Sequence, residues 1–261
     1  MGLLIRDQLH DIPGLTIIPP ASAGGPSWCA LSPRDYRMRR RRVRQLMIHS
    51  TRGDEPQHVI PGAGPGGHAR ATAEFWAGDP TPSGAHLVVD SNGAIACLCD
   101  LAYHEAFHAT VSNPYSVGIE MAQEPDNGIY EAVYDTMIVL VPALCTLLDI
   151  PYFVVADPYT GHPLPRFLDG APGFSGVSGH RCNTEQRGRG DPGDEIFARL
   201  IAAGGEAVLA QQYEDQTRSK ARQRALNARG GELEVDGEAG PASLAEMRRQ
   251  GISRWRDVPT A

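Results

Sequence analysis

The sequence predicts an α/β protein, because segments with the pattern of strands alternate along the chain with segments that have the pattern of helices. Short apolar runs bounded by Gly- and Pro-rich loops recur from residue 45 onward, and longer apolar stretches separate them. The composition is 41% hydrophobic and 21% charged, as in soluble globular chains. It excludes a wholly disordered, collagen-like or disulfide-dense protein.

The first predicted element is a buried strand that ends in polar residues. Leu46–Ile48 is a short apolar run, His49-Ser50-Thr51 follows it, and a Gly/Pro-rich loop then extends to Gly67. A polar side chain at the end of a buried strand is well placed for chemistry. His49 is therefore the first candidate site residue.

The remaining elements continue the alternation. A helix is expected over residues 69–76, and residues 85–98 have the pattern of two strands joined by an Asn92-Gly93 turn. We further expect a strand over 115–121, an apolar helix over 130–148 that tolerates Pro142 poorly, a strand over 152–156, and a helix over 194–209 that Gly204-Gly205 would break. The Pro/Gly-rich stretch 157–179 predicts either a functional loop or disorder.

The net charge and the number and spacing of the cysteines exclude some classes of protein. The chain has 24 Lys and Arg against 31 Asp and Glu, and a net charge of −7 disfavours a dedicated nucleic-acid-binding protein. Five cysteines without paired zinc-ribbon spacing argue against a disulfide framework. Seven of the eleven residues from Arg34 to Arg44 are arginines. This basic segment is either a solvated surface or a contact for an anionic partner such as a membrane or a wall polymer.

The start of the chain and its apolar runs bear on localisation. Residues 1–7 lack the apolar core of a signal peptide, and Arg6 stands where the myristoylation pattern requires Ser or Thr. The longest apolar run, residues 137–148, is interrupted by Pro142 and Thr146 and is too short to cross a bilayer. We expect a chain made in the cytoplasm, without a signal peptide or a transmembrane segment.

One candidate metal motif is a literal H-E-x-x-H formed by His104, Glu105 and His108. On a helix it would place two imidazoles on one face, with the glutamate as the general base of a zinc protease. The segment lies between two predicted strands, which leaves little length for a helix. Val111 and Pro114 also replace the Gly and His of the extended metzincin motif. A zinc protease is therefore an alternative.

A second candidate metal set is spread along the chain. His49 ends a predicted strand, His180 follows Gly179, and Asp191 precedes a predicted helix. Two imidazoles and one carboxylate can hold a catalytic zinc ion and leave a fourth position for water. Cys182 is a rival third ligand, because thiolate also suits zinc. Spacing alone leaves open that these are unrelated loop residues.

Five separated motifs in order add a family resemblance. They are Leu46–His49, Gly84–Asp90 with Asn92-Gly93, Ala106–Ala109, Asn113 with Ser116–Glu120, and Gly179-His180 with Arg189–Gly193. Together, over roughly residues 43–200, they resemble the zinc-dependent N-acetylmuramoyl-L-alanine amidases of the amidase-2 type. That family is related to phage endolysins and peptidoglycan recognition proteins.

The resemblance implies a mixed central β-sheet flanked by helices and a bound Zn²⁺. It assigns His49, His180 and Asp191 as metal ligands, Glu120 as the general base, and Arg189 as the cation for a developing oxyanion, where the family commonly has lysine. It also implies that His86, His108 and Asn113 bind substrate, and that H-E-x-x-H is a coincidence. A non-catalytic peptidoglycan-recognition module is a further alternative, which the retained ligands and Glu120 disfavour.

The C-terminal sequence resembles small helical peptidoglycan-binding modules over residues 226–231, 235–237 and 240–244. A charged helical extension is the alternative. The expected domains are an N-terminal extension over 1–42, a catalytic domain over 43–203, a linker or helix over 204–216, and the small helical module over 217–261. The expected partner is peptidoglycan and not nucleic acid. We expect the protein to reach the cell wall after phage- or secretion-system-mediated release, and a cytosolic recycling enzyme is the alternative.

Overall fold

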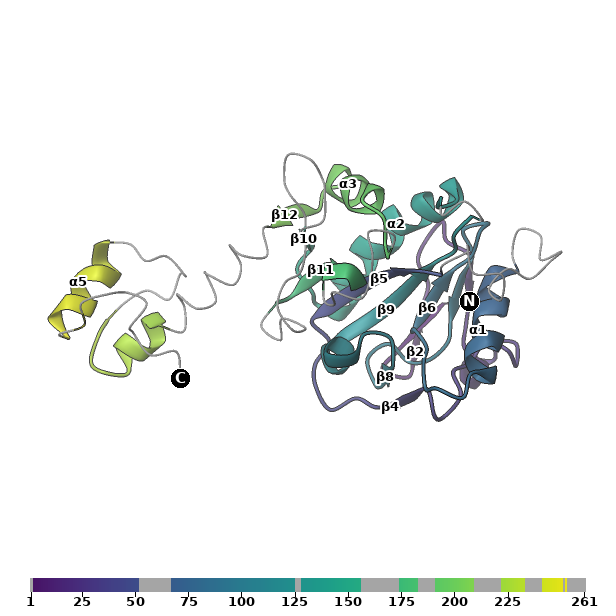
Figure 1. The fold of residues 1–261 in the computed structure, drawn as a ribbon, viewed down its shortest axis with the longest axis horizontal. Coiled ribbons are helices and arrows are strands. Elements are labelled where there is room, and N and C mark those ends of the chain that lie inside the picture. Colours follow the sequence, from purple (N-terminus) through teal and green to yellow (C-terminus); the bar gives the residue numbers. More distant parts are fainter. Residues whose placement is uncertain are drawn as a thin grey trace. The chain divides into compact units, whose positions relative to one another are not determined.

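The computed structural model describes residues 2–51, 67–124, 128–155, 174–182, 191–208, 222–232, 241–250 and 252. The chain forms two compact units, Met1–Val208 (unit 1) and Leu209–Ala261 (unit 2). In the residues described, unit 1 contains the central sheet and three α-helices, and Figure 1 shows both units with most of their elements labelled.

An eight-stranded mixed sheet is the centre of unit 1. Its strands, in spatial order, are β12 (Glu206–Val208), β10 (Phe153–Val155), β11 (Gly176–Gly179), β5 (Gln45–Ser50), β9 (Ser116–Met121), β6 (Leu87–Val89), β7 (Ile95–Cys97) and β3 (Ile17–Ile18). The first six run parallel, β7 is antiparallel to β6, and β3 is parallel to β7. The predicted α/β class with a mixed central sheet is thus confirmed.

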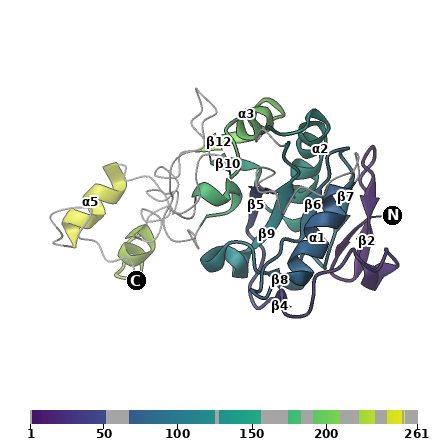
Figure 2. The same ribbon diagram turned by 45° about the vertical axis from the view of Figure 1, so that its right-hand side comes forward.

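Helices cover the two faces of the sheet. Helix α1 (His68–Gly78) packs over β6 and β7, as Figure 2 shows, whereas α2 (Glu131–Leu148) and α3 (Glu195–Ala202) contribute to a separate, larger core. Strand β6 illustrates the division, because Leu87 and Val89 belong to the core of α2 and α3, and Val88 belongs to the core of α1. This alternation follows from the two-residue side-chain period of a strand.

Helix α2 is long and apolar enough to cross a membrane by length and composition, the one such helix among the residues described. Half of it is buried inside the protein, where Val133, Leu140 and Leu144 pack into the core. The helix continues through Pro142, although a proline inside a helix removes one backbone hydrogen bond. Burial in the core of unit 1 therefore explains why one face of α2 is apolar.

Residues near the N-terminus contribute to unit 1. Strands β1 (Leu3–Ile5) and β2 (Gln8–His10) form a hairpin, and β3 joins the central sheet. Strand β4 (Tyr36–Met38) pairs antiparallel with β8 (His104–Ala106), and the short helix η1 (Ala21–Ala23) lies between β3 and β4 in sequence. The part of residues 1–42 that the structure describes is thus built into the sheet unit.

Two segments differ from the sequence-based expectation. Residues 176–179, the end of the Pro/Gly-rich stretch, form strand β11 in the middle of the sheet. The helix expected over 194–209 ends at Ala202, and β12 takes its last part. Gly204 has a φ of 98°, which glycine adopts readily and which breaks the helix. Gly204-Gly205 is therefore the predicted break, but a strand follows it.

Unit 2 is a small helical unit with its own apolar contact. A helical segment over residues 222–227 precedes α5 (Pro241–Arg249), and the buried Leu226 and Met247 pack together. The side-chain amide of Gln250 donates to the Leu226 carbonyl at 2.9 Å, and Arg249 donates to the Gly230 carbonyl at 3.1 Å. The helical character predicted for this part of the chain is present in the residues described.

Candidate metal centre

Strand register brings the predicted ligands together. In the parallel pair of β5 and β11, Ile48 lies opposite Gly179, so that His49 and His180 both come one residue later. On β5 the side chains of Leu46 and Ile48 enter the larger core, and His49 therefore points to the other face of the sheet. Glu120 lies opposite His49 in the register of β5 and β9 and shares that face.

Three buried donor groups form a compact cluster at this point. Nδ1 of His49 lies 2.9 Å from Nδ1 of His180, which lies 3.1 Å from Oδ2 of Asp191. The ligand atoms all lie within 4.8 Å of one another. His49, His180 and Asp191 are only 2%, 5% and 4% exposed. The backbone N–H of Ser50 donates to Oδ1 of Asp191 at 3.1 Å, which fixes the carboxylate beside the histidines.

The donor set fits a small transition-metal ion. Two imidazoles and a carboxylate are the usual ligands of catalytic zinc, and bonds of about 2.0–2.2 Å can bridge atoms at these separations. Among the residues described, the group of mutually close donors contains Asp191 and not Cys182, which is buried in the short helix η3 (His180–Cys182). Arg189 lies outside the described residues.

The H-E-x-x-H motif does not form a metal site in the described structure. Residues 104–106 are strand β8 and not a helix. Nδ1 of His104 accepts the backbone N–H of Asp100 at 3.2 Å, and Glu105 accepts Nε of Arg37 at 2.9 Å. Of the three motif residues, only His108 contacts the cluster of His49, His180 and Asp191.

His108 connects the cluster to a buried hydroxyl. Its Nδ1 lies 2.9 Å from Nε2 of His49, and its Nε2 lies 3.1 Å from Oγ of Ser116. Ser116 in turn donates to the Ser112 carbonyl at 2.7 Å in helix η2 (Thr110–Tyr115). Burial, with a smaller contribution from His180 and then Arg39, lowers the pKa of His108 to about 3, so the ring is neutral at physiological pH.

His86 and Asn113, predicted to bind substrate, lie inside the protein and bind backbone groups. His86 is 0% exposed, its Nδ1 accepts the N–H of Gly118 at 3.0 Å, and its Nε2 lies 3.1 Å from the His104 carbonyl. Burial and then the Arg39 guanidinium lower the pKa of His86 well below its ordinary value. Oδ1 of Asn113 accepts the N–H groups of His108 at 3.1 Å and Ala109 at 2.6 Å. Substrate contact by these residues stays a prediction.

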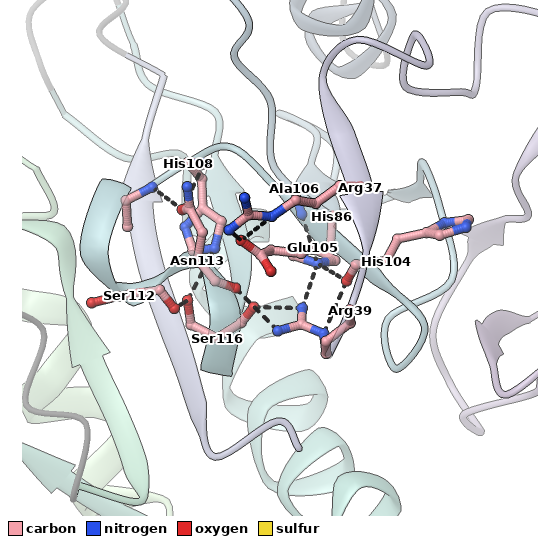
Figure 3. Close-up of polar contacts among 11 residues, drawn as sticks. Arg37, Arg39, His86, His104, Glu105, Ala106, His108, Ser112, Asn113 and Ser116 are labelled. Atoms are coloured by element: carbon pink, nitrogen blue, oxygen red, sulfur yellow. Dashed lines mark hydrogen bonds and ion pairs between the residues drawn. The ribbon is translucent and has the colours of Figure 1, made fainter. Parts of the chain in front are cut away.

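Arg39 is a member of this site that was not predicted from the sequence. Figure 3 shows its guanidinium among residues from β8, η2 and β9. It donates to the backbone carbonyls of His104, Asn113 and Ser116 at 3.0, 3.1 and 2.8 Å. Burial lowers its pKa to about 10. Arg39 stands in a run of arginines that resembles an exposed basic face, and no local signal separates it from its neighbours.

Several other arginines of the basic segment also bind protein groups. Arg34 donates to the carbonyl of Ala77 at 2.8 Å near the end of α1. Arg42 pairs with Asp149, and Arg41 lies over the Tyr115 ring, 5.8 Å from its centroid. These arginines therefore bind the segment to the rest of unit 1, and they also give it positive charge.

The family model for N-acetylmuramoyl-L-alanine amidase, Amidase_2, matches residues 39–194. The chain belongs to this amidase family. The match begins at Arg39 and includes Glu120 and the three donor residues His49, His180 and Asp191. The chain is thus a hydrolase of the amide bond between N-acetylmuramic acid and L-alanine in peptidoglycan, and the predicted family and activity are confirmed.

Several solved structures are similar to the chain over nearly their whole length. A selenomethionine derivative of AmpD is 18% identical, with 75% of this chain and 99% of that chain covered and a TM-score of 0.44. A mutant endolysin from Bacillus subtilis is 18% identical, with coverage of 71% and 99% and a TM-score of 0.45. PGRP-Hd from Alvinella pompejana is 13% identical, with coverage of 75% and 99% and a TM-score of 0.45. No curated protein matches the chain.

Proposed function

We propose that the amidase is a zinc enzyme whose ion is held by His49, His180 and Asp191. The observation that carries this proposal is the convergence of these three buried donor groups, with all ligand atoms within 4.8 Å of one another. Two imidazoles and one carboxylate are a usual ligand set of catalytic zinc, and a cation would give these three neighbouring donor groups one shared partner.

Zn²⁺, when bound, supplies Lewis acidity that polarises an amide carbonyl and makes water more acidic. The substrate carbonyl is that of the lactyl group of muramic acid, in amide linkage to L-alanine. We propose that Glu120, which lies opposite His49 across β5 and β9, is the proton carrier. It accepts a proton from the attacking water and returns it to the alanine nitrogen as the C–N bond breaks. The products are a lactyl carboxylate and a peptide with a free amino terminus.

Arg189 is proposed to stabilise the oxyanion on the carbonyl oxygen through its positive charge. It lies outside the described residues, and its support is the resemblance of Arg189–Gly193 to the family motif, within the residues 39–194 that the family model matches. Its planar guanidinium differs in geometry from the lysine common at this position. Arg189→Lys therefore retains activity under this proposal, whereas Arg189→Ala loses it.

The test is the digestion of purified sacculi by the zinc-loaded protein, with the products analysed by mass spectrometry. We expect peptides with a new free L-alanine amino terminus, and we expect chelator treatment to abolish their release. His180→Ala and Glu120→Gln should release none. Glu105→Gln is the matched control, because a zinc protease that uses H-E-x-x-H would lose its activity with this change. Product release that persists in His180→Ala would overturn the ligand assignment.

We further propose that unit 2 binds peptidoglycan and that the protein reaches the cell wall after phage- or secretion-system-mediated release. The support is the similarity of residues 226–231 and 240–244 to helical wall-binding modules. The arginines of residues 34–44 that remain exposed, such as Arg40, offer an additional contact to an anionic surface. Fractionation of a host culture, with the protein assayed in the cytoplasm and on the wall, tests the localisation.

A further inference from the structure

We propose that His108 is a positioning residue that orients the ring of His49, so that Nδ1 of His49 faces the metal. This inference rests on the proposed zinc site and adds a role for His108 other than the substrate contact predicted from the family motif. It stands on a chain of hydrogen bonds that runs from His49 through His108 and Ser116 to a backbone carbonyl.

The far end of the chain fixes the direction of every hydrogen bond in it. The carbonyl of Ser112 can only accept, so the hydroxyl of Ser116 donates its proton there, at 2.7 Å. Oγ of Ser116 then accepts the proton of Nε2 of His108, at 3.1 Å. A neutral imidazole has one protonated nitrogen, which leaves Nδ1 of His108 as an acceptor.

The same assignment of donors and acceptors determines the tautomer of His49. Nδ1 of His108 accepts from Nε2 of His49 at 2.9 Å, so Nε2 of His49 carries the ring proton. The lone pair of His49 is then on Nδ1, the atom that lies 2.9 Å from Nδ1 of His180 and 3.9 Å from Oδ1 of Asp191. A metal-ligating histidine needs its free nitrogen on the metal side, and a partner on its other nitrogen secures that orientation.

The packing around His108 holds its ring in place. A Cβ atom on Gly118 would lie only 2.6 Å from Cγ of His108, so the glycine provides room for the ring against β9. The side chain of Asn113 holds the backbone N–H of His108, and Arg39 binds the carbonyls of Asn113 and Ser116. Figure 3 shows these side chains converging around His108 and Ser116. Both ring nitrogens of His108 are engaged inside the protein, which favours a supporting role over substrate recognition.

Imidazole nitrogen chemical shifts, measured by NMR on the metal-free full-length protein at pH 7.5, test the tautomers directly. We expect the Nε2–H tautomer for both His49 and His108. A proton on Nδ1 of His108 would overturn the inference, because that ring could then not accept from His49. This readout does not depend on zinc, so it separates the inference from the proposed metal.

Zinc affinity of full-length variants, measured by competition with a chromophoric chelator, tests the consequence. His108→Leu removes the acceptor and should weaken zinc binding by about 10- to 100-fold, the usual effect of losing such a partner. His108→Asn places an amide oxygen near the position of Nδ1 and should recover most of this loss. His68→Leu is the control, because His68 is a partly exposed histidine on α1 that bonds to Ser91 and should leave zinc affinity unchanged.

The outcomes distinguish the orienting role of His108 from the proposed metal site. Wild-type zinc affinity in a folded His108→Leu protein, with a raised KM for muropeptides, would overturn the positioning role in favour of substrate contact. Failure of the wild-type protein to bind zinc, with the Nε2–H tautomers of His49 and His108 present, would instead contradict the proposed metal site alone. Circular dichroism and thermal unfolding establish that each variant is folded.

Discussion

His49 and His180 are 131 residues apart in sequence and meet because their strands are neighbours in register. At the residue scale, the position of a side chain relative to the end of a strand determines whether it can take part in the site. His49 follows the apolar Leu46–Ile48, and this position at the end of a buried strand was sufficient to predict a functional role. Arg39 gave no such signal, because its partners are backbone carbonyls of other segments.

The proposed role of Glu120 leads to a prediction about catalysis. Glu120→Gln should lower kcat by about 10²- to 10⁴-fold, because an amide cannot accept the proton of water. Zinc affinity should change little, because Glu120 is not in the cluster of ligand atoms. Glu124→Gln, beyond the end of β9, is the control. Assays of muropeptide cleavage with zinc-saturated protein measure the effect, and equal rates for Glu120→Gln and wild type would remove Glu120 from the mechanism.

His86 leads to a prediction about stability and pH. Its folded pKa is lowered well below the ordinary value, so below about pH 6.5 the unfolded chain binds a proton that the folded chain does not. The unfolding free energy therefore falls on acidification, by up to about 1.4 kcal/mol per pH unit for this group. Urea unfolding at pH 7 and pH 5 measures the slope. His86→Asn should have a shallower slope than wild type, and an identical slope would contradict this explanation.

At the scale of elements, the strands with clear apolar patterns were predictable and the others were not. Strands β5 and β9 and the hairpin of β6 and β7 lie where the sequence placed them. Strand β11 consists of Gly176, Val177, Ser178 and Gly179, and it has too few apolar side chains for a periodic signal. A Cβ atom on Gly179 would lie 2.7 Å from Cδ of Pro192, so close packing in the folded protein requires glycine here. Glycine is uncommon inside strands, and it therefore weakens the prediction of a strand from the sequence.

The pairing of β4 with β8 leads to a third prediction. Arg37, whose side chain is mostly exposed, pairs with the buried carboxylate of Glu105 across these strands. Arg37→Ala leaves that carboxylate without its charged partner and should lower the unfolding free energy by about 1–3 kcal/mol. Arg40→Ala, at an exposed position of the same segment, should change it by less than about 0.5 kcal/mol. Chemical denaturation measures both, and equal stabilities of the two variants would show that the ion pair contributes nothing.

At the scale of the whole molecule, the division into two compact units allows the proposed attachment through unit 2 to be separated from catalysis by mutation. Leu226 is 0% exposed and packs against Met247 in unit 2. In the full-length chain, Leu226→Asp places a charge in this apolar contact and should unfold unit 2 alone. Cleavage of small soluble muropeptides should be unchanged, whereas co-sedimentation with purified sacculi should fall. Glu232→Gln, at an exposed position, is the control, and unchanged co-sedimentation of Leu226→Asp would assign wall binding elsewhere.

The two edges of the central sheet are formed by β3 and β12, which have only two and three residues. A short edge strand offers few unpaired backbone groups to another chain, and proteins limit aggregation in this way. The long strands β5 and β9, with six residues each, lie in the interior of the sheet, where both of their sides are already hydrogen-bonded. The fold therefore keeps the two longest strands of the sheet away from intermolecular pairing.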